Sequence, residues 1–248
     1  MNNPPLTIVF CLPGNSFSGR FLECWTNLLA WCLANGIRPI LSRKYSNNIY
    51  FSRTMCLGGD VMRGQNQKPF NGKIDYDYIM WIDSDILFTP QQFARLLSHN
   101  VNIVSGVYLM EGGEALATVK DWDEEFFKKH GHFEFMTLAD IEKDSEERLS
   151  KQSAEKDKQT DCSSNPQSEI HNPQLIEVDY TGMGFMLVRK GVFESLEYPW
   201  FRAIEKRIGN MVDFTTEDVA FCLRAKENGF RIHIDTNVKL GHQKTIIL

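Results

Sequence analysis

The fold is decided by the stretch Tyr78-Ile79-Met80-Trp81-Ile82-Asp83-Ser84-Asp85-Ile86-Leu87-Phe88. Its opening apolar run is typical of a strand that is buried on both faces. The two aspartates that follow are not ordinary core residues, because a buried carboxylate needs a partner or a metal. In an extended chain residues i and i+2 point to the same side, so Asp83 and Asp85 can aim together while Ser84 points away.

Paired carboxylates at the end of a buried strand predict a metal site. Hard oxygen ligands suit Mg²⁺ or Mn²⁺, and these ions in turn bind phosphate oxygens. Open α/β sheets bind their ligands at the carboxyl ends of the strands, where this pair would lie. We therefore expect a divalent-metal site that holds a nucleotide diphosphate. The alternative is a turn without chemistry, since aspartates often follow strands and an Asp-x-Asp pattern also arises by chance.

Composition narrows the class of protein. The 248 residues allow one large α/β domain or two small ones. A net charge of -5 provides no polybasic field for nucleic acid or an anionic membrane. Six cysteines without a Cys-x-x-Cys pair favour buried thiols in a reducing compartment over disulfides or zinc.

Targeting signals are not found in the sequence. The first five residues lack the pattern of a signal peptide, and no apolar stretch reaches membrane-spanning length. We expect a soluble, cytoplasmic protein without a membrane span. The apolar end at residues 245–248 suggests one domain of a longer polypeptide with further domains.

Strand and helix signals alternate along the first half of the chain. Apolar runs predict strands at residues 6–12, 37–41, 78–82 and 102–107. Helical spacing and capping residues predict helices at 17–35, 49–62 and 90–98, the last with Thr89 as its N-cap. Strand–helix–strand order predicts parallel pairing with right-handed crossovers. We therefore expect an α/β fold with a mixed, mainly parallel sheet flanked by helices, in a single domain at residues 1–248.

The segment at about 138–173 differs from its surroundings. Glu, Asp, Lys, Ser and Gln dominate it, so it offers little from which to build a core. We expect it to begin as a solvated helix, to continue as a mobile loop, and to be an insertion without chemistry of its own.

Several polar residues allow two interpretations each. Glu217 and Asp218 open a predicted helix, where acidic side chains either complement the macrodipole or act in catalysis. His242 is either a core or surface residue or a metal ligand, and Arg53 pairs either with a phosphate or with a carboxylate. The P-loop, the dinucleotide-binding Gly-x-Gly-x-x-Gly and the Gly-x-Ser-x-Gly elbow are not found in the sequence, so those three classes are excluded.

The order of these motifs resembles that of glycosyltransferases with the GT-A fold, a Rossmann-like architecture. It is also similar to the glycosyltransferase domains of large algal DNA viruses. The resemblance covers nearly the whole chain except residues 138–173. The motifs that carry it are Leu12-Pro13-Gly14-Asn15, Arg53, Trp81-Ile82-Asp83-Ser84-Asp85, Tyr180-Thr181-Gly182-Met183-Gly184, Thr216-Glu217-Asp218 and Gly241-His242.

The resemblance implies a metal-dependent transferase. The donor would be a nucleoside-diphosphate sugar, usually a uridine one, the cofactor Mn²⁺ (or Mg²⁺), and the acceptor a hydroxyl of a glycan or glycoprotein. If the protein is virus-encoded, the host cytoplasm is the expected location. Asp85 would bind the metal directly, Asp83 would bind the ribose or the metal through water, and His242 would be a third ligand.

The resemblance also implies roles around the donor. Asp218 matches the base of inverting members, which makes inversion the favoured outcome, and Glu217 is its neighbour and rival. One departure is that Ser42-Arg43-Lys44 stands where many relatives hold uracil with an acidic residue. The residues implied to surround the nucleotide sugar are Pro13, Gly14, Asn15, Arg53, Asp83, Ser84, Gly182 and Gly184.

Three alternatives remain open. An Asp-x-Asp phosphatase would carry its aspartates on the first strand and a Thr or Val two residues after the second, where this chain has Leu87. A nucleotidyltransferase would join a sugar phosphate to a nucleoside triphosphate. A non-catalytic nucleotide-sugar-binding module would bind without turnover.

Overall fold

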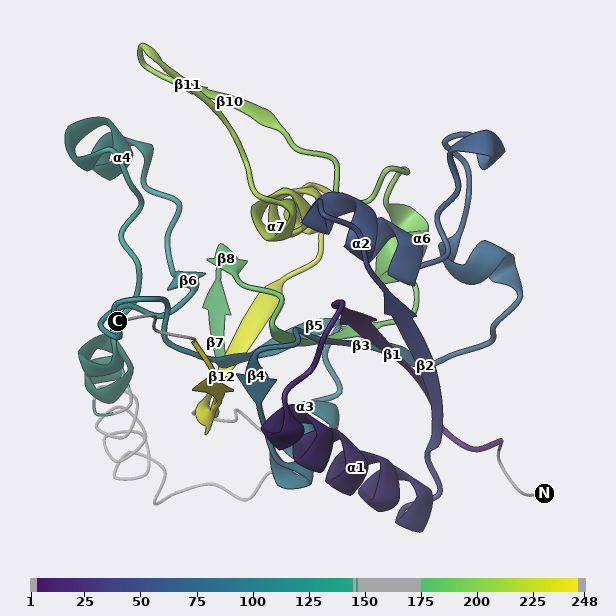
Figure 1. The fold of residues 1–248 in the computed structure, drawn as a ribbon. Coiled ribbons are helices and arrows are strands. Elements are labelled where there is room, and N and C mark those ends of the chain that lie inside the picture. The colour runs from purple at the N-terminus through teal and green to yellow at the C-terminus, as the bar shows by residue number, and fades with distance from the viewer. Residues whose placement is uncertain (1–3, 145, 147–174, 245–248) are drawn as a thin grey trace, which may run out of the picture.

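The centre of the protein is a seven-stranded sheet in the order β2-β1-β3-β9-β5-β12-β7 (Figure 1). The computed structural model describes residues 4–144, 146 and 175–244. The strands are β1 (Thr7–Pro13), β2 (Arg38–Lys44), β3 (Tyr78–Ile82), β5 (Ile103–Val107), β7 (Leu175–Val178), β9 (Phe185–Arg189) and β12 (Ile232–Lys239).

Strand direction confirms the predicted mixed, mainly parallel sheet. β1 pairs in parallel with both β2 and β3, and β5 pairs in parallel with β12. β9 runs antiparallel between β3 and β5, and β7 runs antiparallel at the edge beside β12. Five strands therefore share one direction, and their carboxyl ends meet at one edge of the sheet.

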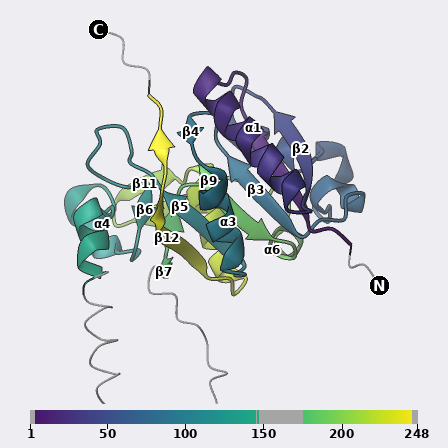
Figure 2. The same cartoon turned by 90° about the horizontal axis from the view of Figure 1, so that it is seen from below.

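Helices cover both faces of the sheet (Figures 1 and 2). α1 (Gly19–Ala34) and α3 (Pro90–Ser98) lie on one face, while α2 (Ile49–Cys56), α6 (Val192–Ser195) and α7 (Glu217–Glu227) lie on the other. Each face has its own hydrophobic core, built around Phe10, Leu28 and Phe93 on the first and around Trp81 and Phe221 on the second. The alternation of β3 side chains between these two cores explains its unbroken apolar sequence.

Helix boundaries follow local chemistry. Ser18 caps α1 by accepting from the backbone N–H of Phe21, and Thr89 forms a capping box with Gln92 at the start of α3. The predicted helix at residues 49–62 is wrong beyond Cys56. Gly58 has a φ of 71°, a left-handed conformation that favours glycine and ends the helix early.

Smaller elements surround the sheet. Two short ladders join β4 (Ile86–Leu87) to β13 (Gly241–His242) and β6 (Thr118–Val119) to β8 (Tyr180–Thr181). The hairpin of β10 (Glu205–Ile208) and β11 (Met211–Phe214) and the helix α4 (Glu124–His130) both extend away from the sheet (Figure 1). The 3-10 helices η1 (Val61–Arg63) and η2 (Pro69–Gly72) follow α2.

The segment predicted as an insertion begins as a helix, as expected. Residues 138–144 are helical, and Ile141 is buried in the core rather than solvated. Most of the predicted segment, together with Cys162 and the apolar end at 245–248, lies outside the described residues. Of the other five cysteines, four are buried thiols as predicted, and Cys24 is half-buried. Among the helices described, none has the length and apolar character needed to cross a membrane.

Candidate functional site

The Asp-x-Asp loop connects β3 to β4 at the carboxyl edge of the sheet. The backbone N–H of Asp83 donates to the carbonyl of Gly184 at 3.0 Å, which fixes the loop against β9. β4 pairs with β13, and this ladder brings the late His242 next to Asp85. The His242 Nε2 lies 3.1 Å from Asp85 Oδ2, and the Lys244 Nζ lies 2.9 Å from the same oxygen.

The other ring nitrogen of His242 fixes how this pair can interact. The His242 Nδ1 lies 2.6 Å from the carbonyl oxygen of Leu109, which accepts but cannot donate, so Nδ1 carries the hydrogen. In the neutral ring, Nε2 then presents a lone pair toward the carboxylate of Asp85. Two lone pairs at this distance repel unless the imidazole is protonated or a cation is shared between them.

The donor set fits a divalent ion. A carboxylate oxygen and an imidazole nitrogen are ligands that suit Mn²⁺. Within the described residues no group of three or more His, Cys, Asp or Glu side chains could hold a metal. An ion held by Asp85 and His242 would take its remaining ligands from water and phosphate, as Mg²⁺ usually does.

Arg53 lies behind the loop and connects it to α7. Its Nη2 lies 3.0 Å from Asp83 Oδ2, and its Nε lies 3.0 Å from Glu217 Oε1. Burial lowers the pKa of the Arg53 guanidinium, but the two carboxylates outweigh burial and raise it. Arg53 is therefore a buried link between carboxylates rather than the open phosphate-binding fork that the sequence allowed. Its Nη1 and the Oδ1 of Asp83 are buried without a partner among the described residues.

The two acidic residues at the start of α7 have different surroundings. Glu217 points inward to Arg53, and burial raises its pKa while Arg53 opposes the rise. Asp218 is partly exposed and accepts three hydrogen bonds: from the Tyr180 hydroxyl at 3.0 Å, from the Thr216 hydroxyl at 2.5 Å and from the backbone N–H of Val219 at 2.8 Å. These donors fix the orientation of the Asp218 carboxylate.

Tyr108 occupies the centre of the site and was missed by the sequence reasoning. Its hydroxyl accepts from the backbone N–H of Gly184 at 3.1 Å, and its ring contacts His242 with 5.1 Å between the ring centroids. Burial raises the Tyr108 pKa, and the negative charges of Asp83 and Asp218 add to the rise. The signal that would have found it is its place immediately after β5, at the same sheet edge as the aspartates.

Tyr108 also explains the two glycines before β9. A Cβ on Gly182 would collide with the Tyr108 hydroxyl, and a Cβ on Gly184 would lie 2.9 Å from its ring. The backbone thus passes close to a tyrosine of the same chain, which accounts for both glycines without a bound sugar.

The loop after β1 meets the Asp-x-Asp loop. A Cβ on Gly14 would lie 3.0 Å from the Ser84 Cβ, so the two loops are in close contact there. Pro13 and Gly14 are buried, whereas Asn15 is exposed. The Arg43 Nη1 donates to the Gly14 carbonyl at 3.0 Å. Arg43 belongs to the Ser42-Arg43-Lys44 segment, where the sequence differs from the family it resembles, and here it supports the loop after β1.

Comparisons with known proteins find distant structural likeness. No protein-family model matches the chain, and no curated protein matches it. The solved structure of A197 from STIV superposes with a TM-score of 0.47 and 17% identity, covering 98% of this chain and 96% of that chain. Glucosyl-3-phosphoglycerate synthase from Mycobacterium tuberculosis, solved with Mn²⁺, uridine diphosphate and phosphoglyceric acid, has a TM-score of 0.39 and 11% identity, covering 98% of this chain and 72% of that chain. Neither likeness is close enough to assign an activity to this chain.

Proposed function

We propose that this protein is a metal-dependent glycosyltransferase of the GT-A type. It would move a sugar from a nucleoside-diphosphate sugar, with uridine expected, to a hydroxyl of a glycan or glycoprotein acceptor. The observation that carries the proposal is the pairing of Asp85 with His242, whose ring presents Nε2 to a carboxylate oxygen at 3.1 Å. We expect a divalent ion to lie between these two groups and to displace Lys244, whose Nζ lies 2.9 Å from the same oxygen.

The Asp-x-Asp loop would bind the diphosphate of the sugar donor. Asp85 and His242 would hold Mn²⁺ or Mg²⁺, which would offset the negative charge that builds on the diphosphate as the sugar–phosphate bond breaks. Asp83 is fixed by Arg53 through its Oδ2, and its carboxylate, which is 26% exposed, would bind the ribose or the metal through water. Ser84 and the loop at residues 13–15 lie against each other beside it and would line the nucleotide.

Asp218 would act as the base on the acceptor hydroxyl. Its three donors leave about one carboxylate lone pair open, which can accept the proton of an attacking hydroxyl. General-base assistance of this kind contributes roughly 10²–10⁴-fold to rate. Direct attack assisted by Asp218 would invert the configuration at the sugar carbon. Glu217 is buried against Arg53, so we assign it a positioning role rather than that of the base.

The test separates metal binding from catalysis. Titration of the protein with Mn²⁺, followed by the loss of the free-ion paramagnetic resonance signal, should show binding that is lost in Asp85→Asn. The matched control is Asp75→Asn, because Asp75 is a highly exposed surface carboxylate that pairs with Lys190. Lys244→Ala should bind Mn²⁺ at least as tightly as the wild type, because it removes a cation that competes for Asp85.

A donor screen then measures turnover. We expect Mn²⁺-dependent release of uridine diphosphate from at least one sugar donor, and Asp218→Asn should lower kcat by about 10²-fold or more while nucleotide affinity is kept. Activity that survives both a chelator and Asp85→Asn would contradict the metal mechanism. Binding of donors without turnover of any would instead identify a non-catalytic module.

A further inference from the structure

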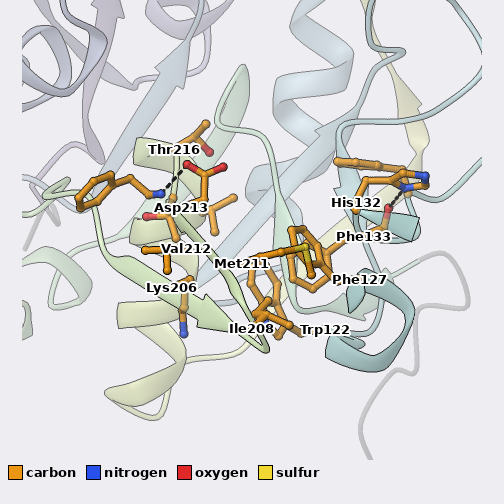
Figure 3. Close-up of a pocket in the computed structure, with 15 residues that line it drawn as sticks. Trp122, Phe127, His132, Phe133, Lys206, Ile208, Met211, Val212, Asp213 and Thr216 are labelled. Atoms are coloured by element: carbon orange, nitrogen blue, oxygen red, sulfur yellow. Dashed lines mark hydrogen bonds between the residues drawn. The ribbon is translucent and has the colours of Figure 1, made fainter. Parts of the chain in front are cut away.

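A groove of about 540 Å³ lies between the β10–β11 hairpin and residues 122–135, a segment that includes α4 (Figure 3). We call it the aromatic groove. Side chains from both segments gather around it, and α4 and β10 are in contact. Its apolar lining includes Trp122, Phe127, Phe133, Phe135, Ile208 and Met211.

The groove extends to the residues that flank the proposed base, Asp218. Thr216 and Val219 both line it. The Thr216 hydroxyl and the Val219 backbone N–H both donate to Oδ1 of Asp218. A molecule bound in the groove therefore lies next to two of the residues that hold this carboxylate.

The walls are aromatic and almost uncharged. The Trp122 and Phe133 rings stack with 3.8 Å between centroids, and Phe127 packs on Phe133 at 4.7 Å. Lys206 and Asp213 also line the groove, so one cation and one carboxylate balance each other. The Trp122 indole N–H is buried and lacks a partner within the described part of the chain, so the Trp122 ring and not its N–H faces a ligand.

We propose that the aromatic groove binds the acceptor, and that the acceptor is an amphipathic glycoside. This assignment rests on the proposed function. One sugar hydroxyl lies at Asp218, and an apolar aglycone or apolar sugar face packs on the rings of Trp122 and Phe133. The volume is within the range of small-molecule sites and has room for a sugar with an attached apolar group. The balanced charge disfavours phosphorylated and polyanionic acceptors.

The test uses matched pairs of probes. Para-nitrophenyl and methyl glycosides of the same hexoses and pentoses are compared by isothermal titration calorimetry, without donor or metal. We expect the nitrophenyl member of at least one pair to bind about fivefold to tenfold tighter, because only it covers the aromatic wall. The bound nitrophenyl group should also quench tryptophan fluorescence, and Trp122→Phe should keep most of the binding while losing most of the quenching.

Two methionine variants localise the binding. Met211→Ala should weaken nitrophenyl binding by about threefold to tenfold and leave the methyl glycoside unchanged. Met62→Ala is the matched control, because Met62 is exposed and lies outside the groove. Equal binding of both probe classes, or equal affinities of the two variants, would overturn the groove assignment.

A separate measurement distinguishes this proposal from the one on which it rests. Slow Mn²⁺-dependent hydrolysis of a uridine-diphosphate sugar without acceptor reports on the donor side alone, and the control Met62→Ala should leave it unchanged. Hydrolysis that persists while the groove fails its binding test overturns only the acceptor assignment. Groove binding without metal-dependent release of uridine diphosphate from any donor overturns the glycosyltransferase proposal instead.

Discussion

Replacing Arg53 by methionine removes the one cation that Asp83 and Glu217 share. The Arg53 side chain is 3% exposed, against 26% for Asp83 and 9% for Glu217. Removing one partner of a buried ion pair costs about 3–5 kcal/mol, because the remaining charge is left without compensation. Most of this cost should come from Glu217, since Asp83 can regain water more easily.

The contact of the Arg53 guanidinium with the Trp81 ring, 5.5 Å from its centroid, adds up to about 1 kcal/mol. In a chain of this size about 1 kcal/mol lowers the midpoint of thermal unfolding by roughly 2–4 °C. We therefore expect Arg53→Met to lower Tm by about 10–20 °C in calorimetry at pH 7. Arg53→Lys should fall between it and the wild type, because an ammonium keeps the charge but loses the fork.

A double variant tests the reasoning. Glutamine carries no charge, so Arg53→Met with Glu217→Gln should be more stable than Arg53→Met alone. A loss below about 1 kcal/mol in the single variant, or a double variant no more stable than the single, would refute a shared buried cation.

The dependence on pH has a defined sign. Burial raises the Glu217 pKa, Arg53 opposes the rise and Asp218 adds to it. An acid with a raised native pKa loses stability as pH rises from its unfolded pKa through its native one. Without Arg53 the native pKa rises further, so the stability gap between Arg53→Met and the wild type should widen with increasing pH.

Two further changes probe the scaffold. Asp235→Asn should cost about 2–4 kcal/mol at pH 7 in chemical denaturation, because Asp235 is fully buried and binds Arg95 and His99 at 2.6 Å each. Burial raises the Asp235 pKa, but its hydrogen bonds lower it by more, so the native pKa lies below the unfolded one. The stability lost in Asp235→Asn should therefore be greatest above about pH 4 and should shrink as pH falls through the native pKa. Gly182→Ala should destabilise by about 1–3 kcal/mol through collision with Tyr108, and Tyr108→Ala in the same chain should relieve that collision; equal losses in the single and double variants would contradict it.

Much of the scaffold could be predicted from local sequence patterns. The strand at residues 78–82 and the helix that begins at Pro90 were predicted with their correct limits, because a buried strand and a capped amphipathic helix both have strong local signals. The position of β9 had no such signal. Its apolar sequence fits either direction, and only pairing with β3 and β5 makes it antiparallel.

The residues of the candidate site could be predicted from the sequence, but the contacts between them could not. Asp85 and His242 were both singled out, yet their contact depends on the ladder between two-residue strands that are too short to predict. The burial of Arg53 could not be predicted either, because its partners Asp83 and Glu217 are 30 and 164 positions away in the sequence. The β10–β11 hairpin and α4, which form the aromatic groove, were missed because neither has a long periodic pattern.

The central position of β9 has a consequence for biosynthesis. Its neighbours β3 and β5 both precede it by more than 75 positions, and β12, the other neighbour of β5, comes later still. A nascent chain that has left the ribosome only as far as β5 therefore has one open edge on β3 and two on β5. The closing strand arrives only after the Asp-rich and Lys-rich segment has been translated. The middle of this sheet is thus completed by a late, long-range step, and until then its unpaired strand edges can pair with other chains.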